Sequence, residues 1–251
     1  MLDYDLTAVI PARLGSSRII EKVFQTIDGN DTLLSRKIKQ LRKILPREKV
    51  IVNTESNEIA EHALDNGANI HWRDPYFSKG HIASFSELIV HVISQIESKH
   101  IAWTPFVVPF FDSNQFRLSF SNYNKMVVKG KYDSLASVVP LKDYIWDEKQ
   151  PLNYIADHRH TISQDLPNWF QITNGNYMAS KKTMLDHQYI LGKKVFLDIR
   201  ENCCKIDIDT LHDLKIARSY YNLELISDNS DTLKSFVSKT TSLKKTAIKH
   251  S

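Results

Sequence analysis

The sequence predicts an α/β fold: a mostly parallel mixed sheet with helices on both faces and a small inserted arm. Short apolar and β-branched runs alternate with amphipathic helical stretches between residues 6 and 139, a pattern typical of βα units. The alternation breaks at about 141–174, which indicates an insert. A chain of 251 residues can bury a large core, so we expect one domain over 1–226.

The first predicted strand covers residues 6–10 and lies at the centre of the sheet, since Thr7 to Ile10 are largely apolar and β-branched. Pro11 ends it, because proline cannot donate a ladder hydrogen bond. Asp31 then stands where it can cap a helix. The apolar residues of that helix share one face: Leu34, Ile38, Leu41 and Leu45.

The same alternation predicts the later elements. Asn66 and Gly67 are a typical helix end, and Asp112 with Ser113 is a typical helix start. The predicted strands are 50–53, 68–72, 100–104 and 134–139, and the predicted helices follow 54–58, cover 84–96 and begin at 112–113.

The insert at about 141–174 carries Trp146, Trp169 and Phe170 among polar residues and prolines. Exposed aromatic side chains on an extension are typical of an interface between protein chains. The alternative is a long loop that packs its aromatic residues against its own domain.

The formal net charge is +4, but most of it lies at one end. Residues 227–251 carry five lysines against two aspartates, so the body is close to neutral. We therefore expect no nucleic-acid partner. The tail is rich in Ser, Thr and Lys and is predicted to be flexible and basic.

No membrane partner is expected either. The longest apolar run, 103–111, is too short to span a bilayer and contains Pro105 and Pro109. Asp3 and Asp5 stand where a secretory signal would be basic. The two cysteines, Cys203 and Cys204, are adjacent and rarely pair at this spacing. We therefore expect a cytoplasmic protein.

The loop after the first strand combines glycine, hydroxyl and cationic side chains. Gly15 allows the backbone to approach a ligand closely. Arginine forks and backbone N–H groups bind phosphate oxygens. The polar and charged residues of the loop are Arg13, Ser16, Ser17, Arg18 and Lys22. They suggest a nucleotide site, and the alternative is a solvated turn.

Two carboxylates follow much later in the chain. Asp207 and Asp209 alternate on a predicted strand, so their side chains share one face. Such a pair suits Mg²⁺, which takes a few carboxylates together with substrate phosphates. Asp209 could instead cap the helix that follows, where Thr210 and Asp213 also fit a capping box.

Several segments in order resemble the synthetases that make CMP-activated acidic sugars, such as those for sialic, Kdo, legionaminic and pseudaminic acids. They are Pro11-Ala-Arg-x-Gly-Ser-x-Arg18 with Lys22, Asn53-Thr-Glu-Ser, Arg73-Asp-Pro75, Val138-Val-Pro-Leu-Lys142, Ser163-Gln-Asp-Leu-Pro167, Thr173-Asn-Gly-Asn-Tyr177 and Ile206-Asp-Ile-Asp-Thr210. The resemblance covers about residues 5–220 and implies a Rossmann-like nucleotidyltransferase.

The resemblance implies that CTP and a 2-keto sugar acid give a CMP-sugar and pyrophosphate, with Mg²⁺ as cofactor and a homodimer built partly by the arm. It also implies roles for particular residues. The nucleotide would be bound by Ala12, Arg13, Gly15, Ser16, Arg18, Lys22 and Arg73, and the sugar by Lys142, Gln164 and Asn174. Asp207 and Asp209 would hold the metal, and Arg13, Lys22 and Asp209 would be catalytic.

The sequence departs from the family pattern at Ile20-Glu21, Val107-Val108 and Ser163. A degenerate paralogue that binds nucleotide without turnover therefore stays open. So does a glycosyltransferase that uses Asp207 and Asp209 as its acidic pair, although that pair normally follows a mid-chain strand. Two local alternatives also remain: an exposed Arg73 that pairs with Asp74, and a simple turn at Asn174-Gly175.

Overall fold

The computed structural model describes residues 2–15, 18–78 and 82–223, so Ser16 and the tail at 227–251 lie outside the described residues. Its centre is a seven-stranded sheet with the order β3-β2-β1-β4-β6-β5-β7, in which β6 is antiparallel to both of its neighbours and all other pairs are parallel. The strands are β1 Leu6–Pro11, β2 Val50–Thr54, β3 Asn69–Trp72, β4 His100–Trp103, β5 Ser134–Leu141, β6 Trp169–Ser180 and β7 Val195–Ile199.

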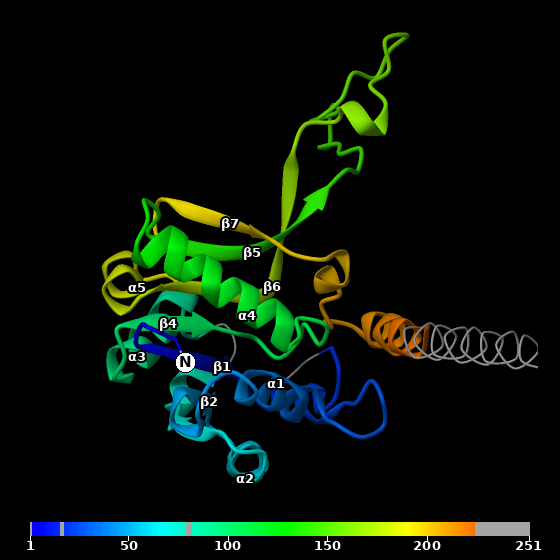
Figure 1. Ribbon diagram of the computed structural model, residues 1–251. Helices are drawn as coiled ribbons and strands as arrows, with labels where there is room; N and C mark the ends of the chain where they lie inside the picture. The colour runs from blue at the N-terminus through cyan, green and yellow to red at the C-terminus, as the bar shows by residue number, and fades with distance from the viewer. Residues whose placement is uncertain (1, 16–17, 79–81, 224–251) are drawn as a thin grey trace, which may run out of the picture.

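Helices lie on both faces of this sheet (Figure 1), which confirms the predicted fold class. They are α1 Leu33–Arg42, α2 Asn57–Asp65, α3 Phe85–Gln95, α4 Ser113–Tyr123, α5 Lys181–His187 and a C-terminal helix described over 211–223. Among the described residues, none of the helices is long and apolar enough to cross a membrane.

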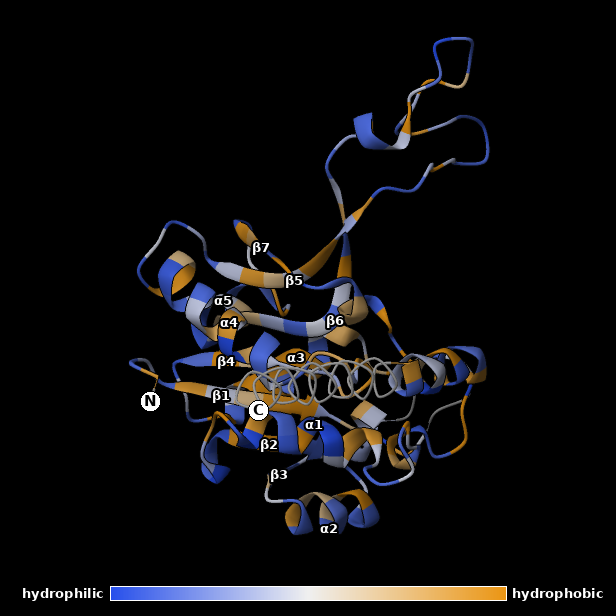
Figure 2. Ribbon diagram, turned by 45° about the vertical axis from the view of Figure 1, so that its right-hand side comes forward, coloured by the Kyte–Doolittle hydropathy of each residue, from blue (hydrophilic) through white to orange (hydrophobic). Residues whose placement is uncertain are grey.

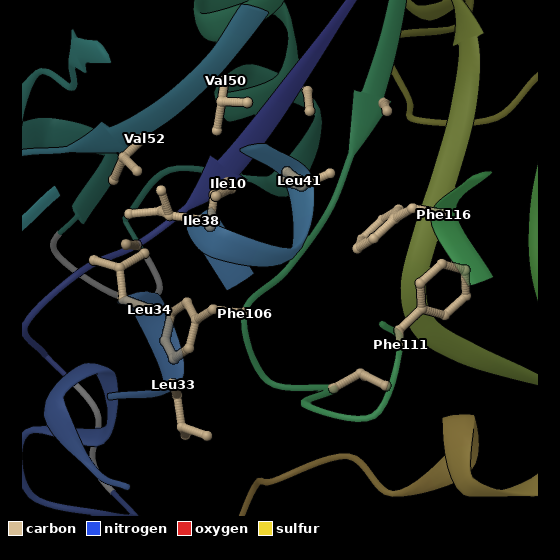
Figure 3. Packing of buried hydrophobic residues seen from close by; sticks show 14 of the residues in the cluster. Ile10, Leu33, Leu34, Ile38, Leu41, Val50, Val52, Phe106, Phe111 and Phe116 are labelled. Carbon is tan, nitrogen blue, oxygen red and sulfur yellow. The ribbon is translucent and has the colours of Figure 1, made fainter. Parts of the chain in front are cut away.

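The core has two layers because neighbouring residues of a strand point to opposite faces. In β1, Ala8 and Ile10 pack in the cluster that contains α1 and α4 side chains, whereas Val9 packs in the cluster that contains α3 and α5 side chains. Figure 3 shows the first layer, where Ile38 and Leu41 of α1 lie near the strands. The central strand is therefore buried on both faces, as its apolar sequence predicts.

The caps correct one predicted helix start. The cap of α1 is Thr32, whose hydroxyl accepts a hydrogen bond from the Ser35 N–H. Asp31 lies outside the cap, and its carboxylate binds Lys39 instead. The predicted helix start at Asp112 is confirmed, and the helix predicted over 84–96 has Ser84 as its N-cap. Gly67 follows the C-cap of α2 with φ of 84°, a left-handed conformation that favours glycine.

One helix residue of α1 is a fully buried lysine. Lys37 donates from Nζ to the carbonyl oxygens of Val108 (2.9 Å) and Phe111 (3.3 Å). Gln40, one turn later, donates to the carbonyl of Pro109 at 2.7 Å. These bonds fix the loop after β4 to α1. Burial lowers the pKa of Lys37 to about 7, because removal from water disfavours the charged form.

This lowered pKa predicts a pH-dependent stability. The unfolded chain keeps a lysine pKa near 10.5, so between pH 7 and 10 it binds a proton that the folded chain has released. The unfolding free energy therefore rises with pH by about 1 kcal/mol per unit in this window. Urea denaturation measures the unfolding free energy, and the difference between the wild type and Lys37→Met should show this rise. For Lys39→Met, at an exposed site of the same helix, the difference from wild type should not rise with pH. A difference between wild type and Lys37→Met that does not change with pH would contradict the lowered pKa.

The arm is the part of the chain between β5 and β6, residues 142–168, and it projects away from the body (Figures 1 and 2). Its aromatic rings pack on one another: the centroids of Tyr144 and Tyr154 are 4.7 Å apart. Trp146 remains 55% exposed. The alternative of a loop packed against its own domain is therefore wrong. Trp169 and Phe170 pair in the ladder with β5, so the projection is shorter than the predicted insert.

Candidate active site

A cavity with a volume of about 490 Å³ lies at the carboxyl ends of β1 and β4. β1 has β2 on one side and β4 on the other, so the strand order reverses here. Ligands of open α/β sheets bind at such a point. The lining residues are Pro11, Ala12, Arg13, Gly15, Arg18, Lys22, Arg73, Phe85, Leu88, Trp103, Pro105, Phe106, Val107 and Asp209.

The loop after β1 forms one side of the cavity. The Ala12 N–H donates to the carbonyl of Asn53 at 2.9 Å, which continues the β1–β2 register past Pro11. Arg13 is exposed and donates from Nη1 to the carbonyl of Ser78 at 3.3 Å. A side chain at Gly15 would meet no described atom within 4 Å, so the space beside it is open to a ligand. The role of this loop toward a nucleotide stays a prediction.

Lys22 joins this loop to the far end of the chain. Its side chain is 10% exposed, and Nζ donates to Oδ1 of Asp209 at 2.9 Å and to the carbonyl of Ile208 at 2.8 Å. Arg18 binds the same Oδ1 of Asp209 at 3.1 Å. Two predicted phosphate ligands and a predicted metal ligand therefore meet at one point.

The backbone that presents Lys22 is unusual. Glu21 precedes it with φ of 48°, in the left-handed region that residues other than glycine adopt at a cost of about 1–2 kcal/mol. Glu21 is one of the positions at which the sequence departs from the family pattern, and Lys22 after it still reaches the cavity.

The segment with Asp207 and Asp209 is not a strand, which corrects the prediction. Residues 206–209 follow a short 3-10 helix, Asn202–Lys205, and the Ile208 N–H donates to the carbonyl of Val107 at 2.9 Å. One such bond does not make a ladder. The two carboxylates still interact, because the negative charge of Asp209 helps to raise the pKa of Asp207.

Asp207 is held by an amide. Asn174 donates from Nδ2 to Oδ2 of Asp207, and Tyr177 donates its hydroxyl to Oδ1 of Asn174 at 2.6 Å. Burial is the main reason that the pKa of Asp207 is raised, and the Asn174 bond opposes this effect. The other oxygen of Asp207, Oδ1, is buried with no hydrogen-bond partner.

Asp209 does not cap the C-terminal helix. Asp213 accepts from the Thr210 N–H at 2.7 Å, and its own N–H donates to the Thr210 hydroxyl at 3.3 Å. This is the reciprocal pattern of a capping box. The capping alternative for Asp209 is therefore wrong, and its carboxylate is available to the cavity.

The donor set fits Mg²⁺. The unpartnered Oδ1 of Asp207 and the cavity-lining carboxylate of Asp209 supply two hard oxygen ligands, and Mg²⁺ completes its shell with water and substrate phosphates. In the described part of the chain, no group of three His, Cys, Asp or Glu residues forms a closed metal site. Asp207 and Asp209 would thus hold the ion only together with a nucleotide.

Arg73 lies directly after β3 and is 5% exposed. It donates from Nε to Oδ1 of Asn53 at 2.8 Å and from Nη2 to the Asn53 carbonyl at 3.1 Å. Burial lowers its pKa to about 10, so it stays charged at neutral pH. The alternative of an exposed arginine paired with Asp74 is wrong, and Arg73 lines the cavity as predicted.

The predicted sugar ligands do not gather in this cavity. Asn174 lies within β6 beside Asp207, so the turn alternative is wrong. Lys142 donates to the carbonyl of Leu166 at 2.8 Å at the base of the arm, and Gln164 is exposed on the arm. Their roles toward a sugar stay predictions.

Sequence reasoning missed the apolar wall of the cavity, formed by Phe85, Leu88, Trp103, Pro105 and Phe106. A signal was present for Trp103, because it ends a strand parallel to β1 and therefore lies at the same edge as Pro11. Phe85 and Leu88 sit at the start of α3, and their pattern resembles that of any buried helix. Asn53 was also missed.

Comparison with known proteins agrees with this geometry. The family model described as "Cytidylyltransferase" matches residues 7–107. Two pseudaminic acid cytidylyltransferases of Campylobacter jejuni, from different strains, are each 24% identical over 225 residues, which is 86% of this chain and 95% of the relative.

Solved structures match the fold. A CMP:2-keto-3-deoxy-manno-octonic acid synthetase complexed with CTP aligns with a TM-score of 0.63 at 12% identity and covers 87% of this chain and 99% of that one. The 2-C-methyl-D-erythritol 4-phosphate cytidylyltransferase of Thermus thermophilus aligns with a TM-score of 0.57 at 13% identity, over 87% and 99% of the two chains.

The cavity is lined by cationic side chains and lies where the strand order reverses, in a sheet that helices cover on both faces. A pair of carboxylates lies beside it. These features together define a nucleotidyltransferase. The cytidylyltransferase model over residues 7–107 and the relatives at 24% identity support the resemblance of this sequence to the CMP-sugar synthetases.

Proposed function

We propose that this protein transfers CMP from CTP to a 2-keto sugar acid of the sialic-acid type and releases pyrophosphate. The observation that carries the proposal is the meeting of Arg18 and Lys22 on Asp209 beside Arg13 and Arg73. Four cations around one cavity suit a triphosphate, and the curated relatives are named for pseudaminic acid.

In this reaction the anomeric hydroxyl oxygen of the sugar acid attacks the α-phosphorus of CTP. The new bond joins that oxygen to the α-phosphorus, and the bond from the α-phosphorus to the oxygen bridging to the β-phosphate breaks. Pyrophosphate leaves with the electron pair, and the hydroxyl proton passes to solvent. The chain needs no covalent intermediate, because phosphoryl transfer depends mainly on positioning and charge.

The residues divide this task. Arg13, Arg18 and Lys22 neutralise the phosphates at the loop after β1, and Arg73 adds a further cation to the wall of the cavity. The apolar wall with Trp103 offers a surface for the cytosine ring. Mg²⁺, when held by Asp207 and Asp209, would neutralise phosphate charge and orient the triphosphate.

The test is pyrophosphate release from CTP, measured with a panel of sugar acids that includes pseudaminic, legionaminic, sialic and Kdo acids. Release that depends on both CTP and one of these acids supports the proposal. CTP binding without release from any acid would favour the non-catalytic paralogue. Transfer from a nucleotide sugar without pyrophosphate release would favour the glycosyltransferase.

Arg13→Ala should weaken CTP binding about 10- to 100-fold. Arg13 lines the cavity from the exposed loop, and a hydrogen bond to a charged group contributes about 1.5–3 kcal/mol. Titration calorimetry with CTP and no sugar acid measures the change directly. Arg117→Ala, an exposed arginine on α4, is the control, and an unchanged affinity for Arg13→Ala would contradict its phosphate role.

We also infer a homodimer in which the arm contacts the second copy. The support is the projection of residues 142–168 from the body together with the 55% exposure of Trp146. Aromatic anchors are favoured at the centre of interfaces. The arm also carries Lys142 and Gln164 away from the cavity of their own chain, so they could serve the cavity of the partner.

Light scattering should give about twice the chain mass of 29.0 kDa. Trp146→Asp should shift the protein toward monomer, because a charge in an apolar contact is costly to desolvate. Leu118→Asp is a matched control, since Leu118 on α4 is equally exposed, at 55%, but lies on the body. A monomeric wild type at micromolar concentration would exclude the dimer.

A further inference from the structure

The side chain of Arg73 is held in position by one other residue, Asn53. Both described hydrogen bonds of its guanidinium go to Asn53: Nε donates to the side-chain Oδ1 and Nη2 to the main-chain carbonyl. Nη1 takes part in neither bond, and the residue lines the cavity. Asn53 thus binds one edge of the guanidinium and leaves the other edge free to bind a ligand.

Asn53 is well placed to hold this charge in one position. It is fully buried near the end of β2, and its carbonyl also accepts from the Ala12 N–H of the phosphate loop at 2.9 Å. A buried asparagine on a central strand has little freedom to move. The position of Arg73 is therefore tied to the same backbone that begins the loop with Arg13.

The amide of Asn53 has only one orientation that satisfies its neighbours. Arg73 can only donate, so Oδ1 of Asn53 must face it. Nδ2 then faces His71, where it lies 2.9 Å from Nδ1 and 3.3 Å from the carbonyl. Nδ2 can only donate, so Nδ1 of His71 must be unprotonated, and the ring proton sits on Nε2.

The surroundings of His71 favour this neutral ring. Burial lowers the pKa of His71, and electrostatic interactions with His91 and Arg73 act in the same direction, while a hydrogen bond to the side chain of Gln95 opposes them. The ring of His91 on α3 packs edge-on against His71, with centroids 6.0 Å apart. If Nδ1 of His71 were protonated, the amide of Asn53 would have to turn over. The N–H groups of that amide would then face Arg73.

We propose that Asn53 is a positioning residue: it fixes the guanidinium of Arg73 in the cavity, and the neutral ring of His71 sets the orientation of its amide. The proposal rests on the proposed function, because CTP binding is used to report the position of Arg73. It adds a chain of contacts, His71 to Asn53 to Arg73, that runs from the edge strand β3 to the cavity.

The first test asks whether Asn53 acts through Arg73. Asn53→Leu, which has a similar volume, should raise the Kd for CTP about tenfold, with a larger effect on the KM for CTP than on kcat. Arg73→Ala should raise Kd at least as much, and Asn53→Leu combined with Arg73→Ala should equal Arg73→Ala alone. Asn69→Leu, at the other end of β3 from Arg73, should bind CTP normally. Additive losses, or an unchanged Kd for Asn53→Leu, would overturn the proposal.

The second test needs neither CTP nor turnover. Asn53→Asp keeps an acceptor for Arg73 but can no longer donate to His71, so His71 should take a proton on Nδ1. NMR titration should show its pKa raised by at least one unit in the ligand-free protein, with near-normal CTP affinity at neutral pH. An unchanged His71 pKa would overturn the proposal, even if Asn53→Leu failed to fold. Wild-type protein that does not bind CTP would instead refute the proposed function.

Discussion

Asp207→Asn should lower the turnover number about a thousandfold while the fold stays intact. Asparagine keeps an oxygen that can accept from Asn174, so the shape of the site is retained. The change removes one of the two carboxylates proposed to hold Mg²⁺, and metal stabilisation of a transferring phosphoryl group is worth several kcal/mol, with each ~1.4 kcal/mol worth a factor of ten in rate.

The measurements are pyrophosphate release across a range of Mg²⁺ concentrations and, separately, Mn²⁺ binding in the presence of a non-hydrolysable CTP analogue. Asp3→Asn is a suitable control, because Asp3 is a surface carboxylate paired with Lys129. Near-normal turnover of Asp207→Asn at saturating Mg²⁺ would remove the metal role from this residue. Loss of turnover together with loss of the far-ultraviolet circular dichroism signal would show that Asp207 is structural instead.

Lys22→Met should lower kcat/KM for CTP by a factor of about 100 to 1,000, the usual effect of removing one preorganised charged donor from a water-poor site. Lys22 is the most buried ammonium at the cavity, and its bonds to Ile208 and Asp209 hold Nζ in place. Methionine fills a similar volume without the charge. The phosphates then lose a fixed cation, and Asp209 loses one of its two described partners.

Thermal unfolding separates this effect from a loss of structure. Asp209 remains bound to Arg18 and is 43% exposed, so the expected stability loss is only about 1 kcal/mol, for the Ile208 carbonyl left without its donor. Lys39→Met, an exposed lysine on α1 that pairs with Asp31, should behave as wild type. A kcat/KM within threefold of wild type for Lys22→Met would show that Lys22 serves structure alone.

The local sequence was enough to predict most elements. Apolar periodicity marks α1, and the N-caps Ser84 and Asp112 of α3 and α4 carry their own side-chain acceptors. The start of α1 was missed by one residue. Asp31 and Thr32 can both cap a helix, and only the path of the backbone determines which of them does. The residues at 206–209 alternate like a strand, but a strand also needs a partner, and Ile208 finds a single bond to Val107.

The site was predictable only in part. The loop from Arg13 to Lys22 and the pair Asp207 and Asp209 each carry a local signal: several cations after a strand, or two carboxylates at a spacing of two. Lys142 and Gln164 carry only the family resemblance, and the structure sets them at the base and on the exposed surface of the arm. Asn53 stands in a segment that resembles the family, but no local signal assigns it a role, because a polar residue at a strand end is usually solvated.

The sequence by itself determined the βα rhythm, the buried central strand and the charged segments at its two ends, since these depend on the period of side chains along one element. The tertiary structure alone decided that Lys22 meets Asp209 across 187 positions, that Asn53 faces both Arg73 and His71, and that Lys37 satisfies the loop after β4. Such pairings depend on which strand ends share an edge of the sheet, and strand order is set by packing of the whole chain rather than by any local pattern.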